Sequence, residues 1–180
     1  MQLYDPCCGT GTLLIEAAIR ASGRAAGIRR RYACENFSFM DPQMMKNERE
    51  KAAAEEEPST PFIIGGSDID PEASELCARH IRQAGFEGRI VLKTQDLRTL
   101  QVPGEPGVFL LNPPYGERLS DQKHVRVLYR EIGELLKRHP GWKMGVITSD
   151  PGFERAFGRR ADKKRRLYNG RLECEYCIYY

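Results

Sequence analysis

Leu3-Tyr4-Asp5-Pro6-Cys7-Cys8-Gly9-Thr10-Gly11-Thr12 joins a short apolar strand to the start of a helix near the N-terminus. Gly9 and Gly11 allow the backbone to turn tightly and to approach a ligand closely, with the N-terminus of the helix behind them. The helix is expected over residues 11–21 because Leu13, Leu14, Ala17 and Ala18 recur on one side of it. A strand, a glycine turn and a helix in this order predict the first unit of an α/β sheet.

The same alternation continues along the chain. Strands are predicted over residues 62–67, 89–94, 107–111 and 143–148, and helices over residues 71–84, 125–138 and 153–157. Residues 162–168 and 171–180 are predicted as strands joined at Asn169-Gly170, a dipeptide typical of a two-residue hairpin. We therefore predict an α/β fold with a Rossmann-like mixed seven-stranded sheet, helices on both faces and a C-terminal antiparallel hairpin.

Residues 23–61 interrupt the alternation and are interpreted as an insertion between the first helix and the second strand. This segment carries the basic triplet Arg29-Arg30-Arg31, which is expected near the ligand-binding end of the sheet. A polar helix is expected over residues 42–57, and residues 48–57 favour a solvated face rather than a binding surface.

The composition fits one soluble domain of 180 residues. The chain is 41% apolar and 29% charged, its formal net charge is +3, and no stretch approaches the ~20 apolar residues of a membrane span. Without a signal-peptide pattern, a cytoplasmic location and reduced cysteines are expected. Cys174 and Cys177 have CxxC spacing but lie on a predicted strand, where positions three apart point to opposite faces, so no metal site is predicted.

The chemistry of the first turn favours a nucleoside with an amino group. Leu14 stands where a dinucleotide fingerprint needs glycine or alanine, and no Lys-Ser/Thr pair follows as in a phosphate-binding loop. Asp5, just before the glycines, would repel phosphate and suits the aminocarboxylate of S-adenosylmethionine. Asp68, after the second strand, can bind ribose hydroxyls, and Asp96, after the third strand, can accept a hydrogen bond from an adenine amine while Leu97 packs on the ring. Each acid could instead cap a helix, and Asp70 before Pro71 is expected to do so.

Asn112-Pro113-Pro114-Tyr115-Gly116 follows the fourth strand directly. The Asn112 side-chain oxygen and the Pro113 carbonyl could accept both hydrogens of an exocyclic base amine and turn its lone pair toward a methyl donor. The prolines fix the turn, and Tyr115 could stack on an extruded base. A plain proline-rich turn is the alternative interpretation.

Together these motifs resemble the class I S-adenosylmethionine-dependent methyltransferases that methylate amines, and more closely the catalytic domain of the THUMP-containing RNA guanine-N2 methyltransferases. The resemblance covers nearly the whole chain, including the segment from Ile15 to Phe37. It implies that Asp5, Gly9 and Gly11 line the methionine end of the cofactor, that Asp68 holds the ribose and Asp96 the adenine, and that residues 112–115 hold the base. The full set of expected cofactor contacts is Asp5, Pro6, Cys7, Gly9, Thr10, Gly11, Asp68, Ile69, Asp96, Leu97 and Asn112.

That family carries a helix and an RNA-binding THUMP domain before the first strand, whereas four residues precede Asp5 here. We therefore expect a single catalytic domain over residues 1–180 without its upstream RNA-binding domain, able to bind cofactor and weak or inactive on RNA by itself.

The resulting hypothesis is methylation of an exocyclic amine of an RNA base, with guanine N2 in ribosomal RNA as the first choice. Adenine N6 of DNA or RNA, and a truncated domain that binds cofactor or RNA without turnover, are the alternatives. Residues 159–171 hold seven basic side chains against one acid. Candidate RNA contacts are Arg29, Arg30, Arg31, Lys163, Lys164, Arg165 and Arg166, although a charged hairpin edge would explain the last four equally well.

Overall fold

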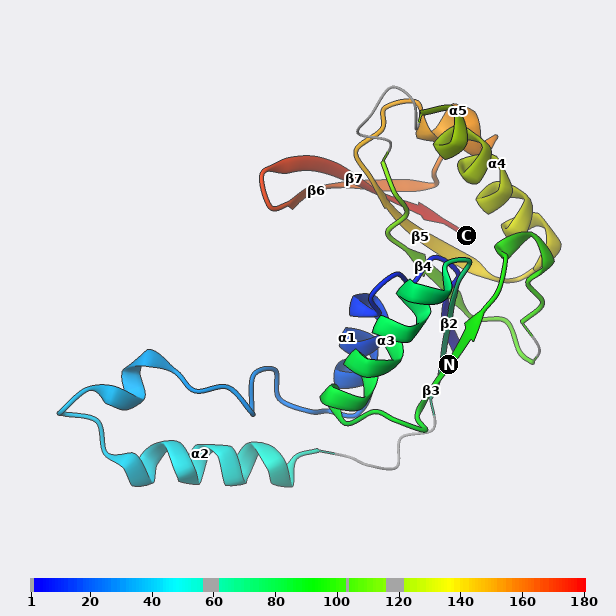
Figure 1. The fold of residues 1–180 in the computed structure, drawn as a ribbon. Coiled ribbons are helices and arrows are strands. Elements are labelled where there is room, and N and C mark those ends of the chain that lie inside the picture. Colours follow the sequence, from blue (N-terminus) through cyan, green and yellow to red (C-terminus); the bar gives the residue numbers. More distant parts are fainter. Residues whose placement is uncertain (1, 57–61, 103, 116–121) are drawn as a thin grey trace.

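The computed structural model describes residues 2–56, 62–102, 104–115 and 122–180. The strands of this part are β1 (Gln2–Asp5), β2 (Ile63–Asp68), β3 (Ile90–Thr94), β4 (Val108–Leu111), β5 (Lys143–Thr148), β6 (Lys163–Asn169) and β7 (Leu172–Tyr179). The helices are α1 (Thr12–Ala21), α2 (Pro42–Ala54), α3 (Pro71–Ala84), α4 (Gln122–Arg138) and α5 (Phe153–Phe157), with 3-10 turns η1 (Ala33–Asn36) and η2 (Leu97–Thr99) (Figure 1).

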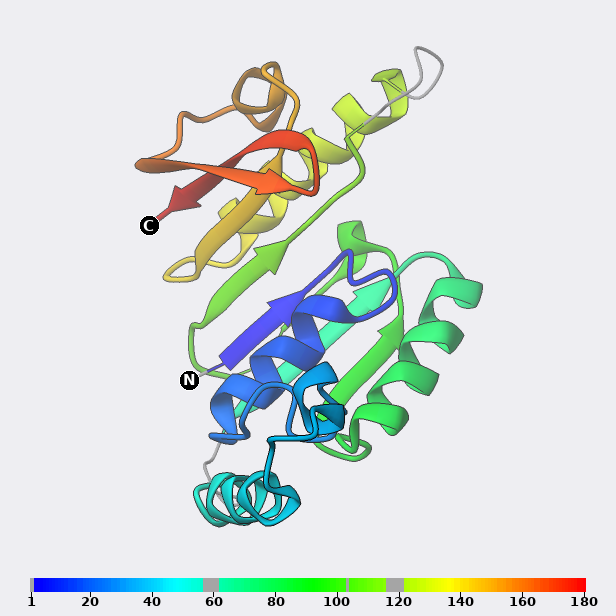
Figure 2. The ribbon, with the colours of Figure 1, turned by 90° about the vertical axis from the view of Figure 1, so that its left-hand side faces the viewer.

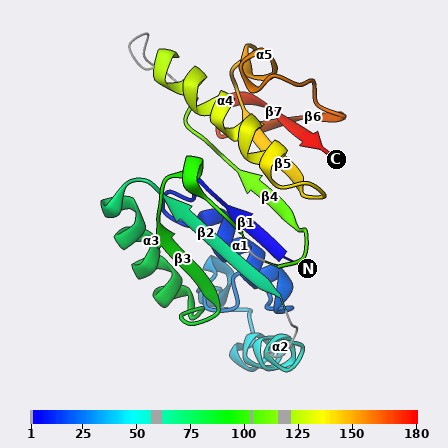
Figure 3. The ribbon, with the colours of Figure 1, turned by 90° about the vertical axis from the view of Figure 1, so that its right-hand side faces the viewer.

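All seven strands form one sheet in the order β3-β2-β1-β4-β5-β7-β6 (Figure 3). The five from β3 to β5 in this order are parallel, whereas β7 is antiparallel to β5 and β6 is antiparallel to β7. The predicted mixed sheet and C-terminal hairpin are thus confirmed. The order of the parallel strands reverses at β1, between β2 and β4, and open α/β sheets bind ligands beyond the carboxyl ends of the strands at such a point.

Helices pack on both faces of the sheet, each over its own buried cluster. α1 and α3 cover β1 to β3 on one face, where Leu14, Cys77 and Phe86 are fully buried. On the other face, α4 and α5 pack over a cluster that includes Tyr129 and Tyr179. On the α1 side, no helix of the described chain covers β5, β7 and β6 (Figure 2).

Local signals explain where the helices begin and end. Gly11 precedes α1 in the left-handed region with φ +85°, and a Cβ there would lie 2.5 Å from the Cys77 sulfur, so only glycine fits the turn. Asp70 caps α3 by accepting a hydrogen bond from the Glu72 N–H, as predicted, with Pro71 at the first helical position. Gly85 then ends α3 in the left-handed conformation.

The insertion lies near the amino ends of the parallel strands, whereas it was expected near their carboxyl ends. The Arg24 guanidinium donates to the carbonyl of Ala84 and pairs with Glu56, and that of Arg29 donates to the carbonyl of Gln83. Ala84 and Gln83 end α3, whereas the ligand-binding edge is at the start of this helix. The expectation that Arg29 lies near the cofactor end was wrong, because the chain leaves α1 at the helix end that points away from the glycine turn (Figure 1).

α2 has no buried residue, in agreement with the solvated helix predicted there, and it ends at Ala54. The predicted last residue of that helix, Glu57, lies outside the described residues. None of the described helices combines the length and the apolar character needed to cross a membrane.

Candidate functional site

A cavity of about 720 Å³ lies at the carboxyl ends of β1, β2 and β4 and at the turn after β3. It brings together nine of the predicted site residues from four separate segments: Pro6, Cys7, Gly9, Asp68, Ile69, Asp96, Leu97, Asn112 and Pro114. The cavity therefore occupies the point of the sheet where the strand order reverses, as the fold predicts.

Five other predicted residues lie behind or beside the wall of this cavity: Asp5, Thr10, Gly11, Pro113 and Tyr115. Asp5 is only 2% exposed, and its Oδ1 accepts a hydrogen bond from the Cys7 N–H at 3.0 Å. Burial raises the pKa of the Asp5 carboxyl to about 8, against the opposing effect of the Cys7 N–H, so this group is mostly protonated at neutral pH. Asp5 thus supports the turn from below. Thr10 is held through its carbonyl, 3.0 Å from His80 Nδ1.

Asp68 connects the first turn with the end of β2. Its Oδ2 accepts from the Gly9 N–H at 2.8 Å, and its Oδ1 accepts from the Asp70 N–H at 3.0 Å. Nearby, the Cys8 N–H donates to the Ser67 carbonyl at 3.0 Å. Each carboxylate oxygen has a further lone pair, so Asp68 can hold the glycine turn and still accept hydroxyl hydrogens from the cavity.

Asp96 lies at the rim and is held by Arg98. The Arg98 backbone N–H donates to Oδ1 at 2.9 Å, and its Nε donates to Oδ2 at 2.8 Å, with Nη2 in contact with the same oxygen. The Arg98 guanidinium and N–H hold the pKa of Asp96 below its usual range. Asp96 is therefore ionised, with a fixed orientation and one free lone pair on Oδ1.

Asn112 and Tyr115 point toward each other after β4. The Tyr115 hydroxyl donates to Asn112 Oδ1, and the Tyr129 hydroxyl of α4 donates to the Pro114 carbonyl at 3.1 Å. Pro113 is buried and Asn112 is exposed. The turn is thus fixed from within the protein, and its amide lies at the cavity. Gly116 lies outside the described residues.

Five residues that line the cavity are not among the predicted site residues: Arg98 and, from α4, His124, Val127, Leu128 and Glu131. The helical spacing of Leu128 had indicated only a buried side, and nothing in the sequence showed that the first turns of α4 border the cavity. Of the three histidines, His124 lines the cavity and His80 contacts the Thr10 carbonyl in the first turn, whereas His139 is buried against Phe109 and Trp142.

The basic candidates fall into two groups. On β6, Lys164 pairs with Glu154 and Glu175, and Arg166 pairs with Glu173, whereas Lys163 and Arg165 project from the other face of the strand. Arg29, Arg30 and Arg31 are exposed in the insertion, where Arg29 contacts the end of α3. Among the described residues, no group of three His, Cys, Asp or Glu side chains could hold a metal ion.

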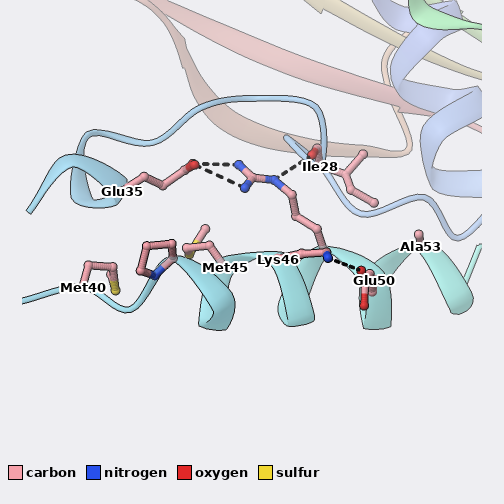
Figure 4. Close-up of a pocket in the computed structure, with 9 residues that line it drawn as sticks. Ile28, Glu35, Met40, Met45, Lys46, Glu50 and Ala53 are labelled. Carbon is pink, nitrogen blue, oxygen red and sulfur yellow. Dashed lines mark hydrogen bonds and ion pairs between the residues drawn. The ribbon is translucent and has the colours of Figure 1, made fainter.

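A further cavity, of about 440 Å³, lies in the insertion between residues 28–40 and α2 (Figure 4). The Arg49 guanidinium crosses it to pair with Glu35 at 2.7 Å and donates to the carbonyls of Ile28 and Arg30. These contacts fix the loop on α2. The cavity is far from the strand ends and is not part of the site.

A family model described as an RMKL-like methyltransferase domain matches residues 1–178. YpsC of Bacillus subtilis, named as a candidate RNA methyltransferase, is 33% identical over 98% of this chain and 46% of its own length. Ribosomal RNA large subunit methyltransferase K/L of Shewanella amazonensis is 36% identical over 98% of this chain and 26% of its own length. The chain thus spans about half or less of these relatives.

The solved structures agree. SMU.472, described as a candidate methyltransferase complexed with SAH, has a TM-score of 0.94 and 37% identity over 99% of this chain and 48% of its own. A Listeria monocytogenes protein described as a predicted N6-adenine-specific DNA methylase has a TM-score of 0.93 and 37% identity over 99% of this chain and 46% of its own. The chain belongs to the family of RMKL-like methyltransferase domains.

Proposed function

We propose that this domain transfers the methyl group of S-adenosylmethionine to an exocyclic amine of an RNA base, with guanine N2 in ribosomal RNA as the preferred target. The observation that carries the proposal is the single cavity into which Gly9, Asp68, Asp96 and Asn112 are brought from four segments of the chain. Carboxylates for the nucleoside and an amide for the target amine thereby border one space.

The residues of the cavity fit the cofactor. Gly9 has a φ of +50° and no atom within 4 Å of where a Cβ would stand, so a ligand can lie directly on its backbone. Asp68 suits the ribose hydroxyls, and the free lone pair of Asp96 suits the adenine amine, with Leu97 and Leu128 as apolar neighbours. Asp5, below this surface, positions Cys7 through its N–H instead of lining the cavity.

When bound, S-adenosylmethionine supplies a methyl on a positively charged sulfur: the amine lone pair forms the new N–C bond, the C–S bond breaks, and its electron pair returns to sulfur. The residues of the chain make the amine a better nucleophile. Asn112 Oδ1 and the Pro113 carbonyl each accept one of its hydrogens, which directs the lone pair toward the methyl. Asn112 Oδ1 has two lone pairs, so it can accept this hydrogen beside the one from the Tyr115 hydroxyl, and the amine proton then passes to solvent.

The choice of RNA rests on the named relatives. YpsC and the K/L enzymes carry RNA methyltransferase names, which supports RNA over DNA as the substrate. The Listeria protein is instead described by adenine N6 of DNA, and that remains the second candidate. Guanine N2 and adenine N6 are both exocyclic amines that need two hydrogen-bond acceptors, so the turn after β4 does not distinguish these substrates.

Two variants separate binding from chemistry. Calorimetry with S-adenosylhomocysteine is expected to show binding to the chain and loss of binding in Asp68→Ala, because the variant loses both the ribose acceptor and the Gly9 contact. Asn112→Ala is expected to keep the affinity and to lose methyl transfer to ribosomal RNA by at least about 100-fold. Asp41→Ala, a cap of the remote α2, is the control. Absence of binding in the unmodified chain would refute the cofactor assignment, and full activity of Asn112→Ala would refute the catalytic role.

A further inference from the structure

Another cavity, of about 470 Å³, lies at the carboxyl end of β5. We call it the second cavity, and the cofactor cavity the first. Its walls are residues 148–151, which form the end of β5 and the turn after it, and side chains of β6 and β7, among them Lys164, Cys174 and Glu175. It shares no lining residue with the cofactor cavity.

The turn after β4 lies between the two cavities. Asn112 and Pro114 line the first cavity, whereas the half-buried Tyr115 has Asn169 and Cys174 of the hairpin as neighbours, on the side of the second. Tyr129 donates to the Pro114 carbonyl and has Thr148 and Asp150 among its own neighbours. An amine held by Asn112 could therefore belong to a base whose ring lies in the second cavity, and its lone pair would face the first.

The polar groups of the second cavity are mostly acceptors, and most of them already have partners. Glu175 pairs with Lys164, and Glu173 pairs with Arg166. Asp150 is different: its Oδ1 accepts from the Gly152 N–H at 2.7 Å, while its Oδ2 has no donor among the described residues. The backbone of Asp150 is fixed as well, because its N–H donates to Thr148 Oγ1 at 3.1 Å. Asp150 thus offers a fixed, free acceptor beside the turn.

We propose that the second cavity holds the target base and that Asp150 selects guanine over adenine by accepting the hydrogen of guanine N1. This inference rests on the proposed function, since it names the base presented to the same turn.

The ring atom next to the methylated amine decides between the two bases. Beside its N2 amine, guanine carries a hydrogen on N1, which a carboxylate can accept. Beside its N6 amine, adenine carries a bare N1, which is an acceptor and would face the carboxylate without a hydrogen between them. A site with a fixed hydrogen-bonding group strongly rejects a ligand that leaves it unpaired. The ammonium of Lys164, in the same wall, is a donor that suits guanine O6.

Binding tests this without turnover. In saturating S-adenosylhomocysteine, we would measure the affinity of single-stranded RNA pentamers with a central guanine, adenine or 2-aminopurine, which keeps the amine of guanine but has a bare N1. The chain is expected to bind the guanine pentamer at least about 10-fold more tightly than either other pentamer. Asp150→Asn keeps an acceptor for Gly152 and puts an NH2 donor in place of Oδ2, so the preference is expected to vanish or to reverse toward 2-aminopurine.

Asp41→Asn, the same change at the cap of α2, is the matched control and is expected to keep the guanine preference. Equal affinities for the three pentamers, no binding of any pentamer, or an unchanged preference in Asp150→Asn would each overturn the inference. Binding of S-adenosylhomocysteine alone reports on the proposed function separately, because Asp150 does not line the cofactor cavity. A preference for adenine would likewise overturn the role of Asp150 while leaving the methyltransferase function intact.

Discussion

Asp5 couples the cofactor turn to the stability of the fold. Burial, the main cause, raises the pKa of its carboxyl to about 8, whereas in the unfolded chain the same group titrates near pH 4. Between these values the folded protein holds one proton more than the unfolded chain. The free energy of unfolding should therefore fall as the pH rises from about 4 to about 8, by up to about 1.4 kcal/mol per pH unit from this group.

Urea unfolding at several pH values checks this contribution. Asp5→Asn, which is neutral throughout, is expected to show a smaller fall than the unmodified chain over the same range. Asp41→Asn, at an exposed cap, should leave the fall unchanged. The same pH dependence in Asp5→Asn as in the unmodified chain would contradict a buried, protonated carboxyl.

Arg98 orients the Asp96 carboxylate, a role that no pattern in the sequence indicates. It pairs with Asp96 through two side-chain nitrogens and one backbone N–H, so its removal frees the carboxylate to rotate at the rim. We expect Arg98→Ala to weaken S-adenosylhomocysteine binding about 3-fold to 10-fold, and Arg98→Lys to restore it only in part, because an ammonium cannot make the paired contact.

Calorimetry with two ligands separates positioning from general charge. The loss in Arg98→Ala should be much smaller for S-inosylhomocysteine, which lacks the adenine amine, than for S-adenosylhomocysteine. Arg126→Ala, an exposed cation of α4, is the control. An equal loss for both ligands would mean that Arg98 does not act through recognition of the amine by Asp96.

The packing of α1 against α3 depends on the glycine that precedes α1. Gly11 and Gly158 have nearly the same φ, +85° and +88°, but a Cβ on Gly11 would lie 2.5 Å from the Cys77 sulfur, whereas nothing lies within 4 Å of one on Gly158. Gly158→Ala should cost only the left-handed backbone conformation, about 1 kcal/mol. Gly11→Ala should cost about 1–3 kcal/mol more, because α3 must move away from α1.

Urea unfolding of the two variants gives the difference directly. S-adenosylhomocysteine affinity should fall only in Gly11→Ala, since Gly11 continues the turn that Asp68 holds through Gly9. Equal destabilisation in the two variants would show that α3 can move away from α1 without loss of stability.

The elements themselves were predictable wherever the signal is local. Pro71 and Gly85 delimit α3, and the apolar run of β5 sets its bounds, so both were predicted to the residue. α4 begins at Gln122, three residues before the predicted start, because its first turn is polar and lacks the apolar spacing on which the prediction relied. The contact of Arg49 with Glu35 and the place of the insertion depend on tertiary packing, to which sequence periodicity gives no access.

The two groups of candidate RNA contacts lie far apart in the molecule. Arg29 contacts the last turn of α3, whereas Asp70 caps its first turn beside the cofactor cavity. The 14 residues of α3 separate these two points by about 20 Å. Arg165 of β6, in contrast, lies opposite Tyr176 of β7 in the sheet. Tyr176 lies opposite Ile147, near the carboxyl end of β5. An RNA that contacts both regions must be long.

RNA length therefore provides the test of these contacts. For a pentamer bound at the turn after β4, Arg165→Ala should weaken binding and reduce the salt dependence by about one phosphate contact, whereas the combined replacement of Arg29, Arg30 and Arg31 by alanine should have no effect. For a transcript of about 40 nucleotides, both variants should bind more weakly, since single-stranded RNA of this length spans far more than the sheet. Lys137→Ala, at the exposed end of α4, controls for net charge. If loss of the arginine triplet weakens the pentamer as much as the transcript, the RNA enters from the insertion side, and the assignment of β6 to the substrate path is wrong.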